Sequence, residues 1–115
     1  MLSKINVLHY LLSLNKRGRF VAHCLNFDIV ATAKSMEEAE RQLDALVRFH
    51  IESYLRTNGA ACLSGPAPKE FFNSYSESLR HGGALPQSIL RISVPQTVPM
   101  PMPYGELEIV AAKAA

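Results

Sequence analysis

FVAHCLNFDIVATAKSMEEA, the stretch from Phe20 to Ala39, decides the fold of this chain. It contains two short apolar segments, FVAHCL and DIVATA, which are separated only by Asn26-Phe27. Ser35 then offers a favourable helix N-cap, and Glu38 follows three residues later, where its carboxylate can reach back to the Ser35 amide. Glu37 and Glu38 also place negative charge at the positive end of the helix dipole. The stretch therefore predicts strand, tight turn, strand and capped helix.

A further strand is predicted before this stretch. Residues 4–14 (KINVLHYLLSL) carry apolar residues on both faces, which favours a central strand. A helix is the alternative, because Leu8, Leu11 and Leu12 also fit a 3.6-residue period. The segment Asn15-Lys16-Arg17-Gly18 favours the strand, since it is typical of a hairpin loop. We expect residues 4–14, 20–25 and 29–32 to form a three-stranded antiparallel meander.

Two helices are predicted after the meander. The first runs from Met36 to about Thr57 and ends at Asn58-Gly59, with Gly59 in the left-handed conformation. Its apolar residues recur at spacings of three and four and are expected to face the core: Ala39, Leu43, Leu46, Val47, Ile51, Tyr54 and Leu55. A shorter amphipathic helix is expected over residues 69–79, and a half-buried strand over residues 88–94.

Proline dominates the next part of the chain, with Pro95, Pro99, Pro101 and Pro103 in nine residues, 95–103. This segment is expected to be extended and polyproline-like, followed by a short strand over 107–110. We thus expect one domain over 1–94 and a proline-rich arm over 95–115 that docks on the parent sheet or on a neighbouring subunit. The predicted fold class is α+β, with a three- to four-stranded antiparallel sheet packed on one long helix (β-β-β-α-(α)-β).

Composition narrows the class of protein. The 115 residues suit one domain, and a net charge of +2 with dispersed basic residues does not favour nucleic acid or an anionic membrane. No apolar run approaches the roughly 18–20 residues of a membrane-spanning helix, and we expect no signal peptide. Cys24 and Cys62 stand far apart without a CxxC motif, which indicates reduced thiols and a cytoplasmic protein.

The sequence predicts no catalytic, cofactor or metal site. The histidines and cysteines are scattered without the short paired spacings of zinc ligands, and no nucleophile motif surrounds Cys24, Cys62 or Ser35. One alternative stays open, in which Asp28 converges with Glu37 or Glu38 to form an acidic site for a metal, a small molecule or general-base catalysis.

The run from Phe20 to Ala39 resembles the HicB-like antitoxin domain. The resembling features are an aromatic-led strand, a short turn into a second strand that ends in a small residue, and then Ser35 followed by an acidic pair and alanine. The resemblance covers about residues 4–57 and departs from the family at Ala33-Lys34, where a glycine is usual. It implies a β-β-β-α-β domain, usually oligomeric, that occludes a small RNA-cleaving toxin.

Complete antitoxins of this family bind operator DNA through a second, C-terminal domain. Only residues 95–115 follow Val94 here, and the prolines fall where the first helix of a ribbon-helix-helix would be, so we do not expect direct DNA binding.

The leading hypothesis is therefore a non-enzymatic, homo-oligomeric, HicB-like protein that acts by protein binding, with a small toxin-like protein as possible partner. A structural homo-oligomer without a toxin is a further alternative. The residues expected to bind the partner lie around the two short strands: Phe20, Ala22, Cys24, Phe27, Asp28 and Val30. Ser35 and Glu38 are assigned to the helix cap.

Overall fold

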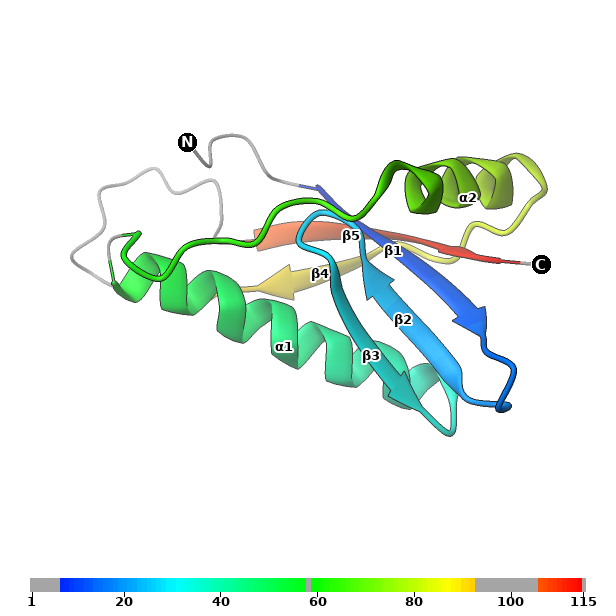
Figure 1. Cartoon of the computed structure of the whole chain (residues 1–115), viewed down its shortest axis with the longest axis horizontal. Coiled ribbons are helices and arrows are strands. Elements are labelled where there is room, and N and C mark those ends of the chain that lie inside the picture. The colour runs from blue at the N-terminus through cyan, green and yellow to red at the C-terminus, as the bar shows by residue number, and fades with distance from the viewer. Residues whose placement is uncertain (1–6, 58, 93–105, 115) are drawn as a thin grey trace.

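The computed structural model describes residues 7–57, 59–92 and 106–114, and these form a five-stranded sheet with a helix on each face (Figure 1). The spatial order of the strands is β3-β2-β1-β5-β4. The elements in chain order are β1 (Val7–Leu14), β2 (Phe20–Cys24), β3 (Ile29–Ala33), α1 (Met36–Arg56), α2 (Lys69–Arg80), β4 (Ser88–Arg91) and β5 (Glu106–Lys113).

The α+β class is confirmed, but the predicted sheet was wrong in strand count and in one pairing. The sheet is mixed, because β5 lies between β1 and β4 and runs parallel to β1, from the pair Val7↔Glu108 to Leu12↔Lys113. The predicted strand 107–110 is the middle of this longer strand. Its pairing joins the two ends of the described chain, which no local pattern specifies. The proline-rich segment 95–103 lies outside the described residues.

The main core lies between the sheet and α1. β1 contributes Leu8, Tyr10 and Leu12, all fully buried, and β1 is the central strand that was predicted. The buried residues of α1 follow a spacing of four: Ala39, Leu43, Val47, Ile51 and Leu55. Leu46 was predicted to join them and does not, because it stands about 100° around the helix from Val47. Its side chain is 46% exposed.

Both ends of α1 are capped, but the expected bond from the Ser35 amide to the Glu38 carboxylate is not among the hydrogen bonds of the described residues. Glu38 N donates to Ser35 Oγ at 3.1 Å, which confirms the N-cap. Glu38 Oε1 accepts from Gln42 Nε2 at 3.3 Å and so serves the next turn of the helix. At the other end Gly59 adopts φ 87°, and its amide donates to Tyr54 O at 2.8 Å, which confirms the left-handed stop.

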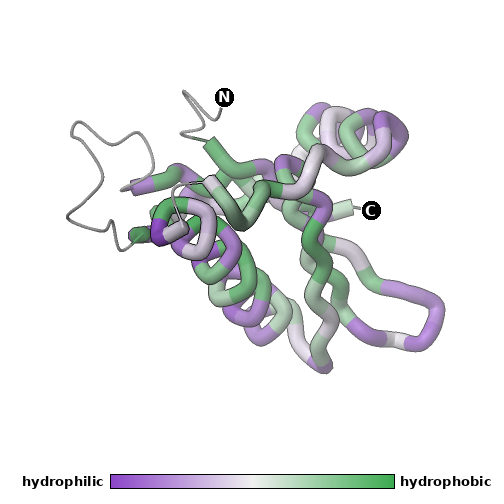
Figure 2. Tube along the Cα trace, turned by 60° about the vertical axis from the view of Figure 1, so that its left-hand side comes forward, coloured by the Kyte–Doolittle hydropathy of each residue, from purple (hydrophilic) through white to green (hydrophobic). Residues whose placement is uncertain are grey.

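The second face of the sheet is covered by α2 over β1 and β5. Tyr75 is buried there, and its hydroxyl donates to Val110 O at 2.9 Å. Leu11, Leu25 and Ala112 complete this smaller core. Figure 2 shows the apolar strands of the sheet and the hydrophilic β1–β2 hairpin loop beyond them. Neither described helix is long and apolar enough to cross a membrane.

Candidate functional site

Two hydrogen bonds at the ends of the β1–β2 pair show which peptide groups of β2 face β1 and which face β3. Asn15 N donates to Arg19 O at 2.9 Å, and Leu25 N donates to His9 O at 2.9 Å. Hydrogen-bonded and non-hydrogen-bonded pairs alternate along antiparallel strands. The odd-numbered residues of β2 therefore bond to β1, and the even-numbered residues face β3.

The outer edge of β3 follows from this alternation. Even-numbered residues of β2 pair with the odd-numbered residues of β3, as in Ala22↔Ala31. The N–H and C=O groups of Val30 and Thr32 consequently face away from the sheet. Within the described ranges, these outward groups have no hydrogen-bond partner. Val30 is 48% exposed, and Thr32 is also exposed, so the edge carries accessible backbone and side chains together.

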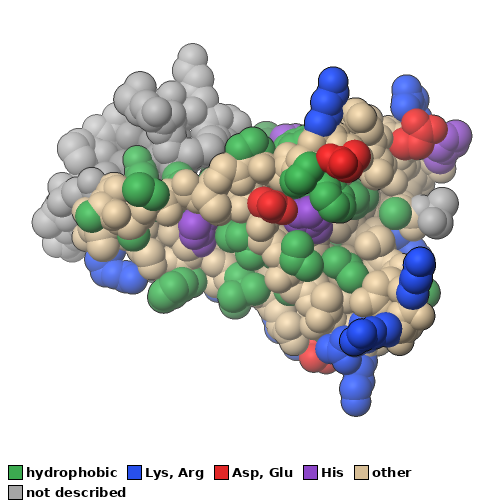
Figure 3. Space-filling model, viewed as in Figure 1, with side chains coloured by type: hydrophobic (Ala, Val, Ile, Leu, Met, Phe, Trp, Pro, Cys, Tyr) green, Lys and Arg blue, Asp and Glu red, His purple; other side chains and the backbone are tan. Residues whose placement is uncertain are grey.

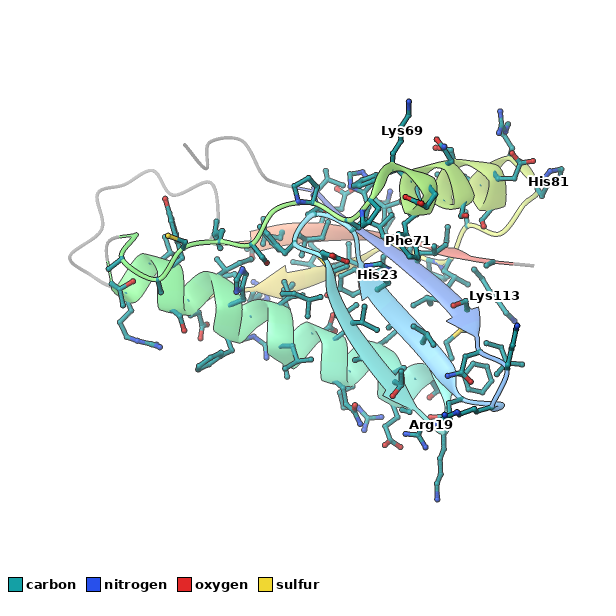
Figure 4. The ribbon with its side chains drawn as sticks, in the orientation of Figure 1. Arg19, His23, Lys69, Phe71, His81 and Lys113 are labelled. Atoms are coloured by element: carbon teal, nitrogen blue, oxygen red, sulfur yellow. The ribbon has the colours of Figure 1, made fainter. Side chains whose placement is uncertain are left out.

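A buried histidine anchors the start of β3. His23 Nε2 lies 2.7 Å from Asp28 Oδ1, and Asp28 adopts φ 55°, a conformation that aspartate tolerates better than most residues. The ring of Phe71 on α2 packs edge-on against His23, with centroids 4.7 Å apart. Figure 4 shows His23 on the sheet pointing toward Phe71. The pair fixes the turn from which β3 departs and holds the Asp28 carboxylate at the surface.

The flank of α1 next to β3 is apolar and exposed. His50 lies on this flank, because its ring packs against Phe27, which stands just before β3. Nε2 of His50 also accepts a hydrogen bond from Ser64 N at 3.0 Å. Burial lowers the pKa of His50. Leu46 lies one turn before His50 and so shares this flank, whereas Phe49, 65% exposed, stands about 160° around the helix from Val47 and faces away from the sheet. We call Asp28, Val30, Thr32 and Leu46 the β3 surface; Figure 3 shows hydrophobic side chains over β3 and along α1 in this view.

The opposite flank of α1 is polar and bonded to the sheet. Asp44 Oδ1 accepts from the buried Tyr10 hydroxyl at 2.7 Å, and Arg48 Nε donates to Arg91 O on β4 at 3.1 Å. Burial raises the pKa of Asp44 above its usual range, against the lowering effect of the Tyr10 hydrogen bond and of Arg48. Burial, with the charge of Asp44 next in importance, also raises the pKa of Tyr10.

The outer edge of β4 can be assigned in the same way as that of β3. Leu85 N donates to Ala111 O at 3.0 Å and Lys113 N donates to Gly83 O at 2.8 Å, so the odd-numbered residues of β5 face β4. Ile89 and Arg91 therefore face outward from β4. The outward carbonyl of Arg91 accepts the hydrogen bond from Arg48. The guanidinium of Arg91 forms an ion pair with Glu106.

The residues predicted to bind a partner fall into two groups. Ala22, Cys24 and Phe27 are buried in the main core, and Phe20 packs against that core. Asp28 and Val30 are exposed on the β3 surface. Whether these residues bind a partner stays a prediction, but of the six only Asp28 and Val30 are exposed.

The sequence prediction missed Thr32 and Leu46. A signal for Leu46 was present, because it is an apolar residue outside the four-residue spacing of Leu43, Val47 and Ile51. No comparable signal marked Thr32, since its outward direction depends on the pairing of β2 with both of its neighbours.

The alternative acidic site is not assembled. Asp28 precedes β3 while Glu37 and Glu38 follow it, so the five-residue strand, about 17 Å long, lies between them. In the described part of the chain, no three His, Cys, Asp or Glu side chains are grouped to hold a metal ion. Burial raises the pKa of Cys24 to about 11, which keeps this thiol protonated and unreactive at neutral pH.

One shallow hollow of about 240 Å³ lies elsewhere, where α2 ends against β5. Glu77, His81 and Lys113 are among its lining residues, and Figure 4 shows His81 at the end of α2. Glu77 is engaged by Arg80 and by His81 Nε2 at 3.0 Å, and this hydrogen bonding lowers the pKa of Glu77. The hollow is below the size of most small-molecule pockets.

Comparison with known proteins gave no match to a family model, a curated protein or a solved structure.

Proposed function

We propose that this chain is a non-enzymatic, cytoplasmic, HicB-like protein that acts by protein binding, with the β3 surface as its contact. The observation that carries the proposal is the outer edge of β3, where the peptide groups of Val30 and Thr32 face solvent beside the exposed Leu46 of α1. An extended segment of a partner can add to such an edge through main-chain hydrogen bonds. Leu46 would then give apolar contact next to the added strand.

The class of partner rests on the resemblance of residues 20–39 to HicB-like antitoxins. In that family the partner is a small RNA-cleaving toxin, and the present proposal takes the same class of partner for this chain. The strand–turn–strand–capped-helix unit that carries the resemblance corresponds to β2, β3 and the start of α1. Occlusion of a toxin needs a rigid, accessible contact, and the His23–Asp28 bond supports one by fixing the start of β3.

The test is inhibition of RNA cleavage by a small basic toxin of the class that HicB-like antitoxins occlude, sought among the genes next to that of this chain. We expect wild-type protein to bind that protein and to suppress cleavage at equimolar concentration. Thr32→Pro should abolish suppression, because it removes an outward N–H and keeps the bonds between β2 and β3. Ile89→Pro removes an outward N–H from the other edge strand and serves as the matched control. Unchanged cleavage with excess wild-type protein, or equal loss in both variants, contradicts the proposal.

No observation favours the small-molecule or metal alternative, because the strand β3 separates Asp28 from Glu37 and Glu38. The homo-oligomer alternative is supported by the same observation as the proposal, since a second copy of the chain could also add to the outer edge of β3.

A further inference from the structure

The outward groups of β3 restrict how a second copy of this strand can pair with it. In an antiparallel pair, hydrogen-bonded residues must both present their peptide groups to the partner. Val30 and Thr32 are the two residues of β3 that do so. Three registers satisfy this condition: Val30 opposite Val30, Thr32 opposite Thr32, or Val30 opposite Thr32 of the partner subunit.

Charge at the two ends of β3 selects one of the three. Asp28 precedes the strand and Lys34 follows it, and both side chains are exposed. When Val30 lies opposite Thr32 of the partner subunit, the same register sets Asp28 opposite Lys34 of the partner subunit, and twofold symmetry repeats this pair. The other two registers bring neither Asp28 nor Lys34 opposite its counter-charge. Opposite charges stabilise a cross-strand pair, and like charges destabilise it.

We propose that two copies of this chain pair antiparallel through β3, about a twofold axis at Ala31. Val30 bonds to Thr32 of the partner subunit, Asp28 faces Lys34 of the partner subunit, and the two sheets become continuous. The contact is isologous, as in most homodimers. This inference goes beyond the proposed function and does not depend on it, because a second copy would compete with a toxin strand for the outward groups of Val30 and Thr32.

The apolar flank of α1 fits the same arrangement. α1 packs against β2 and β3 in each copy, and the flank with His50 lies opposite the flank that Arg48 bonds to β4. Pairing of the strands brings the two flanks toward each other across the axis. Leu46, 46% exposed in the single chain, thereby gains apolar contact. The twofold axis thus accounts for the open edge, the charges and the exposed Leu46 together.

Disulfide trapping tests the register. Val30→Cys and Thr32→Cys are each introduced into the full chain with Cys62→Ser, which removes the exposed thiol. Directly opposite, hydrogen-bonded residues lie about 5.5 Å apart at Cα, within disulfide range. An oxidised mixture of the two variants should give a covalent dimer, and each variant alone should not. A covalent dimer from one variant alone, or none from the mixture, overturns the proposal. Circular dichroism confirms that each variant is folded.

Charge exchange tests the pairing of Asp28 with Lys34 independently. Light scattering should report a dimer for wild type, and Lys34→Glu and Asp28→Lys should each weaken it about tenfold or more, the second also by removing the His23–Asp28 bond at the start of β3. Mixing the two variants should restore a heterodimer, because each charge again meets its opposite. Lys16→Glu, on the exposed hairpin loop, is the matched control and should leave the dimer unchanged. A monomeric wild type, or a mixture no stronger than its components, overturns the inference.

These results separate the two proposals. A wild-type chain that stays monomeric and still suppresses the RNA-cleaving protein refutes the β3 dimer and leaves the proposed function in place. A β3 dimer that never suppresses cleavage refutes the toxin partner and leaves a homo-oligomer paired through β3.

Discussion

The two edge strands of the sheet, β4 and β3, differ in the side chains of α1 that lie next to them. At β4, Arg48 of α1 binds the outward carbonyl of Arg91, whose own side chain pairs with Glu106. At β3, the same helix presents Leu46 on the flank next to outward groups that have no partner among the described residues. Charged residues are a common protection of edge strands against unwanted pairing. On β4 one outward group, the Arg91 carbonyl, is thus already bonded, while Ile89 stays exposed. This difference supports the proposal that β3 is the edge that binds a partner.

The largest expected effect concerns the loop that leads into β4. Gly83 approaches its neighbours so closely that a Cβ would lie 2.5 Å from Lys113 O and 2.8 Å from Ser78 O. We expect Gly83→Ala to reduce the free energy of unfolding by about 2–3 kcal/mol, since backbone atoms cannot move away as a side chain can. Urea denaturation measures it. Gly65→Ala is the control, because a Cβ there meets nothing within 4 Å. Equal stability of the two variants would contradict the close approach.

A smaller loss is expected at the polar flank of α1. Tyr10→Phe removes the hydroxyl that donates to Asp44, and leaves a partly buried carboxylate without that donor. The free energy of unfolding should fall by about 1–2 kcal/mol, because an unsatisfied buried acceptor keeps its desolvation cost. Tyr54→Phe serves as the matched control and should change stability far less. If both substitutions cost the same, the Tyr10–Asp44 bond does not hold α1 to the sheet.

Arg48→Met tests the protection of the β4 edge directly. The substitution keeps the length and much of the apolar stem of the side chain and deletes the bond to Arg91 O. We expect a loss of about 0.5–1 kcal/mol in thermal unfolding, because the bond is exposed. Arg41→Met, at another exposed position of α1, should be nearly neutral. A neutral Arg48→Met would show that this bond does not protect the β4 edge.

The smallest effect is a pH dependence on the β3 side of α1. The pKa of His50 is lowered below its usual 6.5 in the folded chain, so the unfolded chain binds this proton more readily. The His50 contribution is therefore complete above the unfolded pKa and is lost as pH falls through the folded pKa. Stability should decline below about pH 6.5, by well under about 1 kcal/mol for this half-buried group. His50→Gln keeps an acceptor for Ser64 N and should remove this part of the decline; an unchanged decline would exclude His50 as its source.

Local features of this chain were predictable and the pairing of its ends was not. Ser35 and Gly59 act on residues within five positions, so the limits of α1 could be read from the sequence. The parallel contact of β1 with β5 joins Val7 to Glu108, and no local pattern encodes it. The same holds for the candidate site, because the contact of His23 with Phe71 joins two elements that are distant in sequence.

The direction of the β3 edge required the structure for a related reason. The alternation of side chains suggested that Val30 and Thr32 share one face, but not that their peptide groups point away from β2. That direction depends on the register of β1 with β2 and of β2 with β3. Leu46 is the opposite case, since its exposure follows from the four-residue spacing of the α1 core and was available from the sequence.

Amide hydrogen exchange at Val30 and Thr32, followed as protein concentration rises, tests the open β3 edge most directly. The account predicts fast exchange at both amides in dilute protein and slower exchange as β3 pairs with the partner copy. Ala31, bonded to β2 in either state, and Ile89, outward on β4, should not respond to concentration. Fast exchange of Val30 and Thr32 at every concentration, or slowing at Ile89 instead, would contradict the account.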